Sequence, residues 1–518
     1  MARRILIDCG FGSLASKRPT GYLIMLLAAL GLALPATARD QGVVAPVAWA
    51  NRLTWGISPA STPTADAAGS ERWLAEQLSG DPGALPAEAQ KLIDTFRITH
   101  QPMAALVVDE DAQIRAANAM TDATQRQAAR DAYQKGMNAL ADEARSRSLL
   151  RDLYAPDQLR EQMTWFWFNH FNVQAGKRDI RAMVGDYEDT IRSHALGNFR
   201  DLLEATLKHP AMLRYLDNDQ NAAGRINENY AREIMELHTM GVGSGYSQQD
   251  VQELARILTG VGVDLKPETP KMKPALLPLY VRAGLFEFNP ARHDFGAKKF
   301  LGHDIRGAGF DEVEQALDLI AASPATAHHV SLQMATYFMG DTPPPAVVDA
   351  MARTFLRSHG DIAQVLRAMF RAPQFQSSLG PVFKDPIHYA ISAVRYTYGD
   401  RVILNPQPII GWLNRMGEGL YNHETPDGYD MHSDAWAGPG QMATRFDIAR
   451  QIGGGASGLF RPPGATADQP AFPQLQNALY FNTLQARLAQ PTRDALAKAT
   501  SPQEWNALFL SSPEFMHR

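Results

Sequence analysis

The sequence is nearly free of cysteine, and this absence limits how the folded protein can be stabilised. Its one cysteine, Cys9, lies in an amino-terminal segment that we expect to be removed on export. A mature chain without cysteine forms no disulfide of its own and offers no thiol nucleophile. Its stability must come from an apolar core, and a composition of 45% hydrophobic and 20% charged residues is ample for one.

An excess of basic residues is also missing. The formal net charge is −5, and the segment expected to be removed carries four basic residues and one Asp, so the mature protein is more acidic still. A protein of this charge is not built to neutralise phosphates, so we expect no nucleic-acid partner. No long apolar run follows the amino-terminal one, so we expect no membrane span after the signal is cleaved.

Established catalytic signatures are a third absence. The sequence contains no HExxH metal motif, no GxSxG nucleophile motif, no phosphate-binding loop and no glycine-rich dinucleotide turn. Standard hydrolase and nucleotide-dependent functions lose support accordingly. Whether the protein is an enzyme stays open at this point.

Residues 1–38 are typical of a secretory signal peptide. Basic side chains precede an apolar run over residues 22–34, and small residues follow at 36–38. We expect cleavage after Ala38 and a periplasmic or secreted protein. Retention as a membrane anchor is the alternative, but the run is shorter than the roughly 20 residues that span a bilayer. The pair Arg3 and Arg4 leaves both the twin-arginine and the general export route open.

Apolar residues recur at helical spacing through most of residues 39–518, whereas strand signals are scarce. This pattern predicts an all-α fold: one large multi-helix globular domain with long loops. Residues 103–151 predict a long amphipathic helix or a helix pair. Residues 279–288 are the one candidate for a short β-hairpin, and the Gly-rich and Pro-rich residues 453–470 predict a surface loop.

The densest group of reactive side chains lies in residues 227–238. On a helix, Glu228, Arg232, Glu233 and Glu236 share one face, while His238 falls among the apolar residues. One interpretation is a solvated face with weak ion pairs between side chains four residues apart. The other is a polar stripe in a cleft, where the Arg keeps catalytic carboxylates ionised. The two interpretations differ in burial, which a sequence does not show.

Two histidines are further candidates. His170 lies in the aromatic-rich run WFWFNHFNV at residues 165–173, where buried polar groups need hydrogen-bond partners, so we expect it to join the carboxylates as an acid or base. His293 and Asp294 follow an irregular stretch and suit a metal site, with a divalent metal as the candidate cofactor. An aromatic core and an ordinary turn are the plainer interpretations of these two segments.

Taken together, these motifs resemble a family of bacterial exported proteins known as domain of unknown function 1800 (DUF1800). The resemblance rests on an ordered set of short motifs: NRLTWG (51–56), FNHFNV (168–173), HPAML (209–213), NENYARE (227–233), ELHTMG (236–241), GY (245–246), HD (293–294), PATA (324–327), WLNRMG (412–417), TPDGY (425–429) and SPEF (512–515). One departure is Val261, where the family usually has Trp, so an aromatic contact is in doubt there.

The resemblance implies a helical fold, export and frequent genetic pairing with exported sulfatase-like proteins, but no established activity. It favours a functional role for the Glu228 to Glu236 stripe, because the stripe belongs to the family pattern. Two hypotheses stand. The first is a hydrolase-like or metal-dependent enzyme acting on an envelope or extracellular polymer. The second is a non-catalytic partner or scaffold for an exported sulfatase-like protein. A carbohydrate-binding module ranks third, because most Trp residues follow core patterns.

Overall fold

The computed structural model describes residues 41–58, 67–80, 83–380, 382–462, 464–467 and 472–518. The expected signal peptide and Cys9 lie outside these residues. Residues Gln41–Arg518 form one compact unit whose regular secondary structure is almost all helix, which confirms the all-α prediction. None of the helices in the described part of the chain is both long and apolar enough to cross a membrane.

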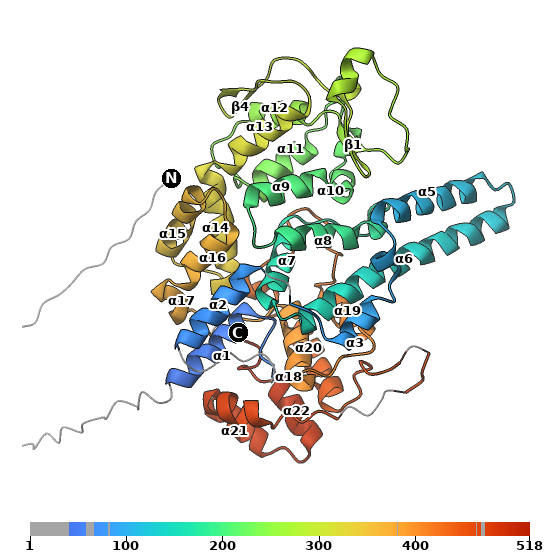
Figure 1. Ribbon diagram of the computed structural model, residues 1–518. Coiled ribbons are helices and arrows are strands. Elements are labelled where there is room, and N and C mark those ends of the chain that lie inside the picture. Colours follow the sequence, from blue (N-terminus) through green and yellow to red (C-terminus); the bar gives the residue numbers. More distant parts are fainter. Residues whose placement is uncertain (1–40, 59–66, 81–82, 381, 463, 468–471) are drawn as a thin grey trace, which may run out of the picture. The chain divides into compact units, whose positions relative to one another are not determined.

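The first helices after residue 40 are short, and a long helical hairpin follows them (Figure 1). The short helices are α1 (Gln41–Leu53), α2 (Ala67–Ser79), α3 (Ala87–Ile93) and α4 (Arg97–His100). The hairpin consists of α5 (Met103–Ala119) and α6 (Ala123–Tyr154), which lie side by side and confirm the predicted helix pair. Asp122 caps α6 by accepting a hydrogen bond from the Gln125 backbone N–H.

Helix α7 (Gln158–His170) lies in the apolar core. Its aromatic residues 165–168 are all buried, and Trp167 is fully so. Large aromatic side chains remove much apolar surface from water, so this helix anchors the elements around it. Those that follow along the chain are η1 (Ile180–Ala182), α8 (Val184–His194), α9 (Phe199–Lys208), α10 (Pro210–Tyr215), η2 (Asn218–Gln220), α11 (Asn229–Glu233), the π-helix η3 (Ile234–His238) and α12 (Gln248–Ile257).

The few strands are short. The elements of this region are β1 (Val261–Val263), η4 (Pro274–Leu279), β2 (Val281–Ala283), β3 (Phe286–Phe288), η5 (Pro290–Arg292), β4 (Lys299–Phe300) and β5 (His303–Asp304). Strands β2 and β3 form the predicted hairpin around Gly284, and β1 pairs antiparallel with the other edge of β3. Strands β4 and β5 form a separate two-stranded ladder.

The carboxyl-terminal half is helical again, and proline opens many of its helices. These are α13 (Phe310–Ala321), α14 (Pro324–Met339), α15 (Pro345–Arg357), α16 (Ile362–Phe370), α17 (Pro373–Ser377), α18 (Pro386–Tyr398), α19 (Gln407–Met416), η6 (Ser433–Ala435), α20 (Pro439–Gly453), the π-helix η7 (Tyr480–Leu484), η8 (Gln485–Arg487), α21 (Gln490–Ala497) and α22 (Pro502–Leu510). Proline in the first turn removes no helical hydrogen bond, so it is well tolerated where a helix begins.

Candidate functional site

The acidic stripe lies on α11 and the start of η3, and it is partly exposed. Arg232 forms ion pairs with Glu228 and Glu236 at 3.2 and 3.3 Å, and the three side chains are 36%, 34% and 26% exposed. Gln248 bridges Arg232 and Glu228. Pairs exposed to this degree each contribute only a few tenths of a kcal/mol. The contacts of these three residues therefore fit the solvated face better than the catalytic cleft.

Glu233 differs from the rest of the stripe. Burial raises the pKa of its carboxyl group above the usual range, and the charges of Glu236 and Asp427 add to this effect. Asp427 belongs to the loop between α19 and α20. Glu233 therefore senses charges from both the stripe and that loop.

His170 meets the same segment from α7. Its Nε2 donates a hydrogen bond to the carbonyl oxygen of His238 at 2.9 Å, and Nε2 of His329 lies 3.3 Å from the carbonyl of Leu237. A π-helix widens the turn and disrupts the regular backbone pairing, and two imidazoles bind carbonyl groups of this turn. The ring of His170 lies 6.1 Å from that of His238 and 6.4 Å from that of His329. His170 therefore joins a histidine cluster at the end of the stripe.

The three histidines are held neutral. Burial lowers the pKa of His170 to about 3, with a smaller effect from His329. Burial also lowers the pKa of His238 and that of His329. The charges of His170 and His329 lower the pKa of His238 further. The side chain of His238 lies among apolar residues, as the helical spacing predicted, and its Nε2 has no hydrogen-bond partner in the described part of the chain.

This cluster predicts a specific acid sensitivity. Below pH about 6.5 these histidines bind protons in the unfolded chain but stay neutral in the folded chain. The free energy of unfolding therefore decreases as the pH falls toward the folded-state pKa. Replacing His170 by Gln removes one such group, and should reduce the slope of unfolding free energy against pH between 6 and 4 by about 1.4 kcal/mol per pH unit. Urea unfolding at several pH values measures the slope. The exposed His100→Gln should leave it unchanged, and equal slopes for all three proteins would contradict the prediction.

His293 and Asp294 serve different partners in the structure. The buried His293 ring lies between the Thr259 carbonyl, 2.8 Å from Nδ1, and Glu312, 3.4 Å from Nε2. The Asp294 carboxylate accepts hydrogen bonds from Arg256 and from the Gly296 backbone N–H, and Arg256 lowers its pKa to about 2. These contacts fasten the irregular segment to α12 and α13. Among the described residues, no group of three or more His, Cys, Asp or Glu side chains is placed to hold a metal ion.

A different pair of acids converges at the amino terminus of α18. Asp385 is its N-cap, and its carboxylate accepts a hydrogen bond from the His388 backbone N–H at 2.8 Å. Glu418 accepts one from the neighbouring Ile387 N–H at 2.9 Å. Gly417, at φ +88°, ends α19 with a left-handed turn, so Glu418 leaves the helix and reaches α18. Two acids from distant segments thereby share one helix terminus.

The surroundings of the two acids shift their pKa values in opposite directions. Burial raises the pKa of Glu418, which is 2% exposed, well above its usual range, and the charge of Asp385 raises it further. Burial alone would raise the pKa of Asp385 too, but His388 and Arg518 lower it below its usual value. When the pair holds a single proton, that proton therefore resides on Glu418.

The hydrogen bonds of His388 support this charge assignment. Arg518 can only donate, so its Nη1, 2.6 Å from Nε2 of His388, requires that nitrogen to accept. Nδ1 of His388 then carries the proton and donates to Asp385 at 2.7 Å. Burial lowers the pKa of His388 to about 4, in agreement with a neutral ring. The His388 ring thus links the Arg518 guanidinium to the Asp385 carboxylate. Both ring nitrogens have hydrogen-bond partners within the protein, so neither is free to bind a substrate.

A small cavity adjoins the acids. Its volume is about 20 Å³, which is enough for one water molecule. Aromatic side chains form much of its wall, and Trp165 stacks on Tyr429 with ring centroids 6.3 Å apart. The residues around it are Trp165, Phe166, Asn169, Tyr337, Val382, Phe383, Asp385, Glu418, Tyr429, Asp430, Met431, Trp436 and Arg518.

The loop of residues 417–438 supplies part of this wall, and α7 holds it in place. The Asn169 carboxamide donates to the Tyr429 carbonyl at 2.9 Å and accepts from the Tyr429 N–H at 2.7 Å. Asn172 donates to the carbonyls of His423 and Thr425. Asn169 and Asn172 of the aromatic-rich run therefore have hydrogen-bond partners, and those partners belong to the loop beside the acids.

With this geometry described, comparison with known proteins gives one match. A family model described as Protein of unknown function (DUF1800) matches residues 48–517, nearly the whole chain. The chain belongs to the DUF1800 family. Neither curated proteins nor solved structures gave a match.

Several DUF1800 motifs that are distant in sequence meet around the acid pair. Asn169 and Asn172 of FNHFNV bind the loop that contains TPDGY, and WLNRMG ends at the glycine that directs Glu418. The sequence hypothesis missed Asp385 and Glu418. An Asp before a Pro is a common helix start, and Glu418 sits alone after a Gly, so neither carries a local signal of chemistry.

Proposed function

We propose that this DUF1800 protein is an exported hydrolase-like enzyme that acts on an envelope or extracellular polymer, with Glu418 as general acid and Asp385 as its ionised partner. The observation that carries the proposal is the acid pair itself: two carboxyl groups at one helix terminus whose surroundings move their pKa values in opposite directions. Such pairs divide acid and base roles between them. The chemistry they support needs no metal to supply the proton.

The surroundings of the pair fit a hydrolytic reaction. The cavity beside the acids has room for one water molecule, and aromatic rings from α7 and the loop form a stacking surface of the kind that sugar rings use. Tyr429, Asp430, Met431 and Trp436 are among the residues that line the cavity, and Glu418 is buried, so we expect a polymer to reach Glu418 only after residues 417–438 move. Loop movement that admits substrate and then excludes water is a common part of such catalysis.

Export is part of the proposal and rests on residues 1–38 of the sequence. A cysteine-free mature chain with a large apolar core suits an oxidising compartment, because it has no thiol to protect. A periplasmic or secreted enzyme would meet envelope polymers directly.

The test uses purified protein and a panel of polymers: peptidoglycan, capsular polysaccharide and extracellular polysaccharide fractions. Product is measured as new reducing ends or new amino groups. Glu418→Gln keeps the shape but donates no acid proton, so it should lower the rate at least about 100-fold. Glu88→Gln on α3, which is exposed, serves as the matched control and should retain full activity.

The outcomes are separable. Equal rates for wild type and Glu418→Gln, with unchanged circular dichroism and melting temperature, would remove Glu418 from the chemistry and contradict the proposal. If the protein releases product from none of the polymers in the panel, this result would also contradict the proposal. A hydrolytic rate that is lost in Glu418→Gln and retained in Glu88→Gln supports it.

A second candidate is a partner or scaffold for an exported sulfatase-like protein, and one observation favours it. An open, mostly apolar groove of about 800 Å³ lies among α20, α21 and α22, with Phe446 and Leu508 exposed at 43% and 36%. Exposed apolar surface of this kind suits protein docking. Co-purification of the two proteins from the periplasm, with no product from any polymer, would favour this candidate over the enzyme.

A further inference from the structure

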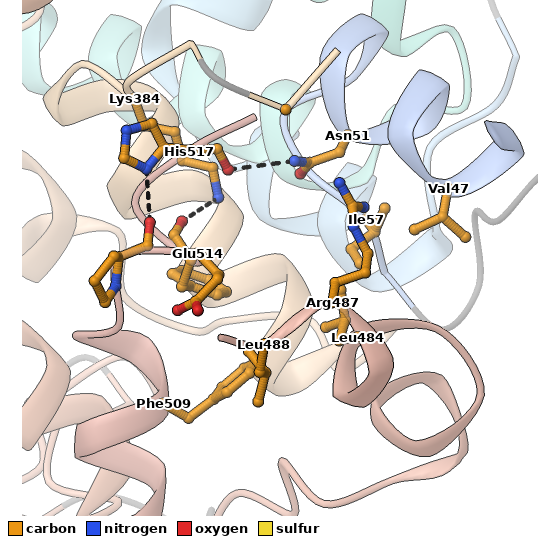
Figure 2. A pocket seen from close by; sticks show the side chains of 13 residues that line it. Val47, Asn51, Ile57, Lys384, Leu484, Arg487, Leu488, Phe509, Glu514 and His517 are labelled. Carbon is orange, nitrogen blue, oxygen red and sulfur yellow. Dashed lines mark hydrogen bonds between the residues drawn. The ribbon is translucent and has the colours of Figure 1, made fainter. Parts of the chain in front are cut away.

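A second cavity, of about 400 Å³, is lined in part by Lys384, the residue before Asp385. Four parts of the chain form it: α1, the segment at Lys384, the helices η7 and η8, and the residues after α22. Figure 2 shows Arg487 reaching toward Asn51, with the side chains of Leu488 and Phe509 below it. Lys384 and Asp385 are neighbours in sequence, yet they line different cavities.

Arg487 brings a positive charge into this cavity without a partner. Its guanidinium makes no hydrogen bond or ion pair with any residue that the structure describes, and burial alone lowers its pKa. A partly buried cation without a counter-charge is costly, because it has lost water and gained nothing in exchange. An anion bound beside it would remove that cost.

The other charged groups of the cavity do not neutralise Arg487. Glu514 is the nearest acid among the lining residues, but its two oxygens accept hydrogen bonds from the Ala489 N–H at 2.6 Å and the Thr492 hydroxyl at 2.9 Å, which fix the start of α21. Lys384 adds a second basic group, whose Nζ donates to the Phe515 carbonyl at 2.8 Å and to Ser392 at 3.1 Å. Burial lowers the pKa of Lys384 to about 7, so an anion bound in the cavity would favour the protonated amine, which has a third N–H to donate.

The rest of the cavity is mainly apolar. Val47, Ile57, Leu488 and Phe509 are buried side chains that line it, and the volume is in the range of small-molecule sites. An inorganic anion would leave this apolar surface empty. A ligand with an anionic end and an aliphatic body would fill both parts.

We infer that this cavity is a binding site for an organic anion, an aliphatic carboxylate whose charged end meets Arg487 and Lys384 and whose chain lies against Ile57, Leu488 and Phe509. The inference is independent of the proposed hydrolytic function, because it uses another cavity and no residue of the acid pair. It would hold equally for an enzyme and for a scaffold.

Octanoate, octanamide and inorganic phosphate are the probes, and titration calorimetry on the intact mature protein is the measurement. Octanoate should bind one molecule per chain. Octanamide, which has the same chain without the charge, and the variant Arg487→Gln should each weaken binding about tenfold or more, the loss expected for one charge-assisted hydrogen bond. Arg357→Gln, an exposed Arg at the end of α15, is the matched control and should bind octanoate like the wild type.

Arg487→Gln should fold, because the side chain it removes has no partner within the described residues, and its melting temperature should equal or exceed that of the wild type. Equal octanoate affinity in Arg487→Gln and wild type would overturn the inference. So would equal affinity for octanamide, which would indicate a purely apolar cavity, or equal affinity for phosphate, which would indicate a small-anion site. Failure of octanoate to bind at millimolar concentration would overturn it as well.

Discussion

Replacing Arg52 by Met should lower the free energy of unfolding by about 4 kcal/mol, because three buried carbonyl groups would lose a charged donor. Arg52 is fully buried on α1, and its guanidinium donates to the carbonyl oxygens of Phe338, Ser378 and Arg518. The Phe338 carbonyl belongs to the last turn of α14, where a cation also interacts favourably with the helix dipole. The one side chain therefore ties α1, α14 and the carboxyl-terminal segment together.

Chemical unfolding at neutral pH measures this effect. Arg52→Lys keeps the charge but lacks the planar fork, so it should recover only part of the loss. Arg357→Gln is again the exposed control and should change stability by less than about 0.5 kcal/mol. A loss below about 1 kcal/mol in Arg52→Met would show that these hydrogen bonds add little beyond what water provides.

Replacing Gly428 by Ala should displace the loop over the acid pair and cost about 3 kcal/mol or more, since overpacking and backbone strain act together. Gly428 has φ +73°, and a Cβ atom there would lie 2.2 Å from the carbonyl oxygen of Asn169. Neither the backbone oxygen nor the turn can move freely, because the Asn169 side chain holds Tyr429 from both sides. The clash must therefore break the two hydrogen bonds between the Asn169 side chain and the Tyr429 backbone.

Gly243 offers a closely matched control. Its φ is +72°, and no heavy atom in the described part of the chain lies within 4 Å of the position of an added Cβ. Gly243→Ala should show the backbone strain alone, about 1 kcal/mol. Hydrogen exchange should quicken at residues 425–430 in Gly428→Ala and stay unchanged there in Gly243→Ala. Equal stability loss in the two variants, with no change in exchange, would mean that the loop is not clamped by Asn169.

Much of the fold could be predicted from the sequence, because its helices and the hairpin depend on local residue patterns. The apolar spacing of residues 103–151 predicted one long helix or a helix pair, and the structure has a pair, α5 and α6. The alternation near residue 281 predicted a hairpin, and β2 and β3 form it. The third strand, β1, was not predicted, because it comes from about 20 residues earlier and is recruited only by pairing with β3.

The candidate site was harder to predict from the sequence, because its residues come from distant segments and lie close together only in the folded chain. The stripe from Glu228 to Glu236 stood out as a dense local pattern, yet burial decides its chemistry, and its side chains are partly exposed. Asp385 and Glu418 gave no local pattern at all, and the turn at Gly417 brings them together. The need of a buried His170 for a hydrogen-bond partner is predictable from its aromatic neighbours, and in the structure that partner is the backbone carbonyl of His238.

The wide turn at Ile234–His238 has a consequence for how this chain is aligned with others. A π turn carries one more residue than an α turn over a similar length of helix. A relative whose helix is regular at this point should therefore align with a one-residue gap between residues 234 and 238. An alignment without that gap would set Glu236 and His238 against residues from a different face of the helix, and would make a shared histidine look like a substitution.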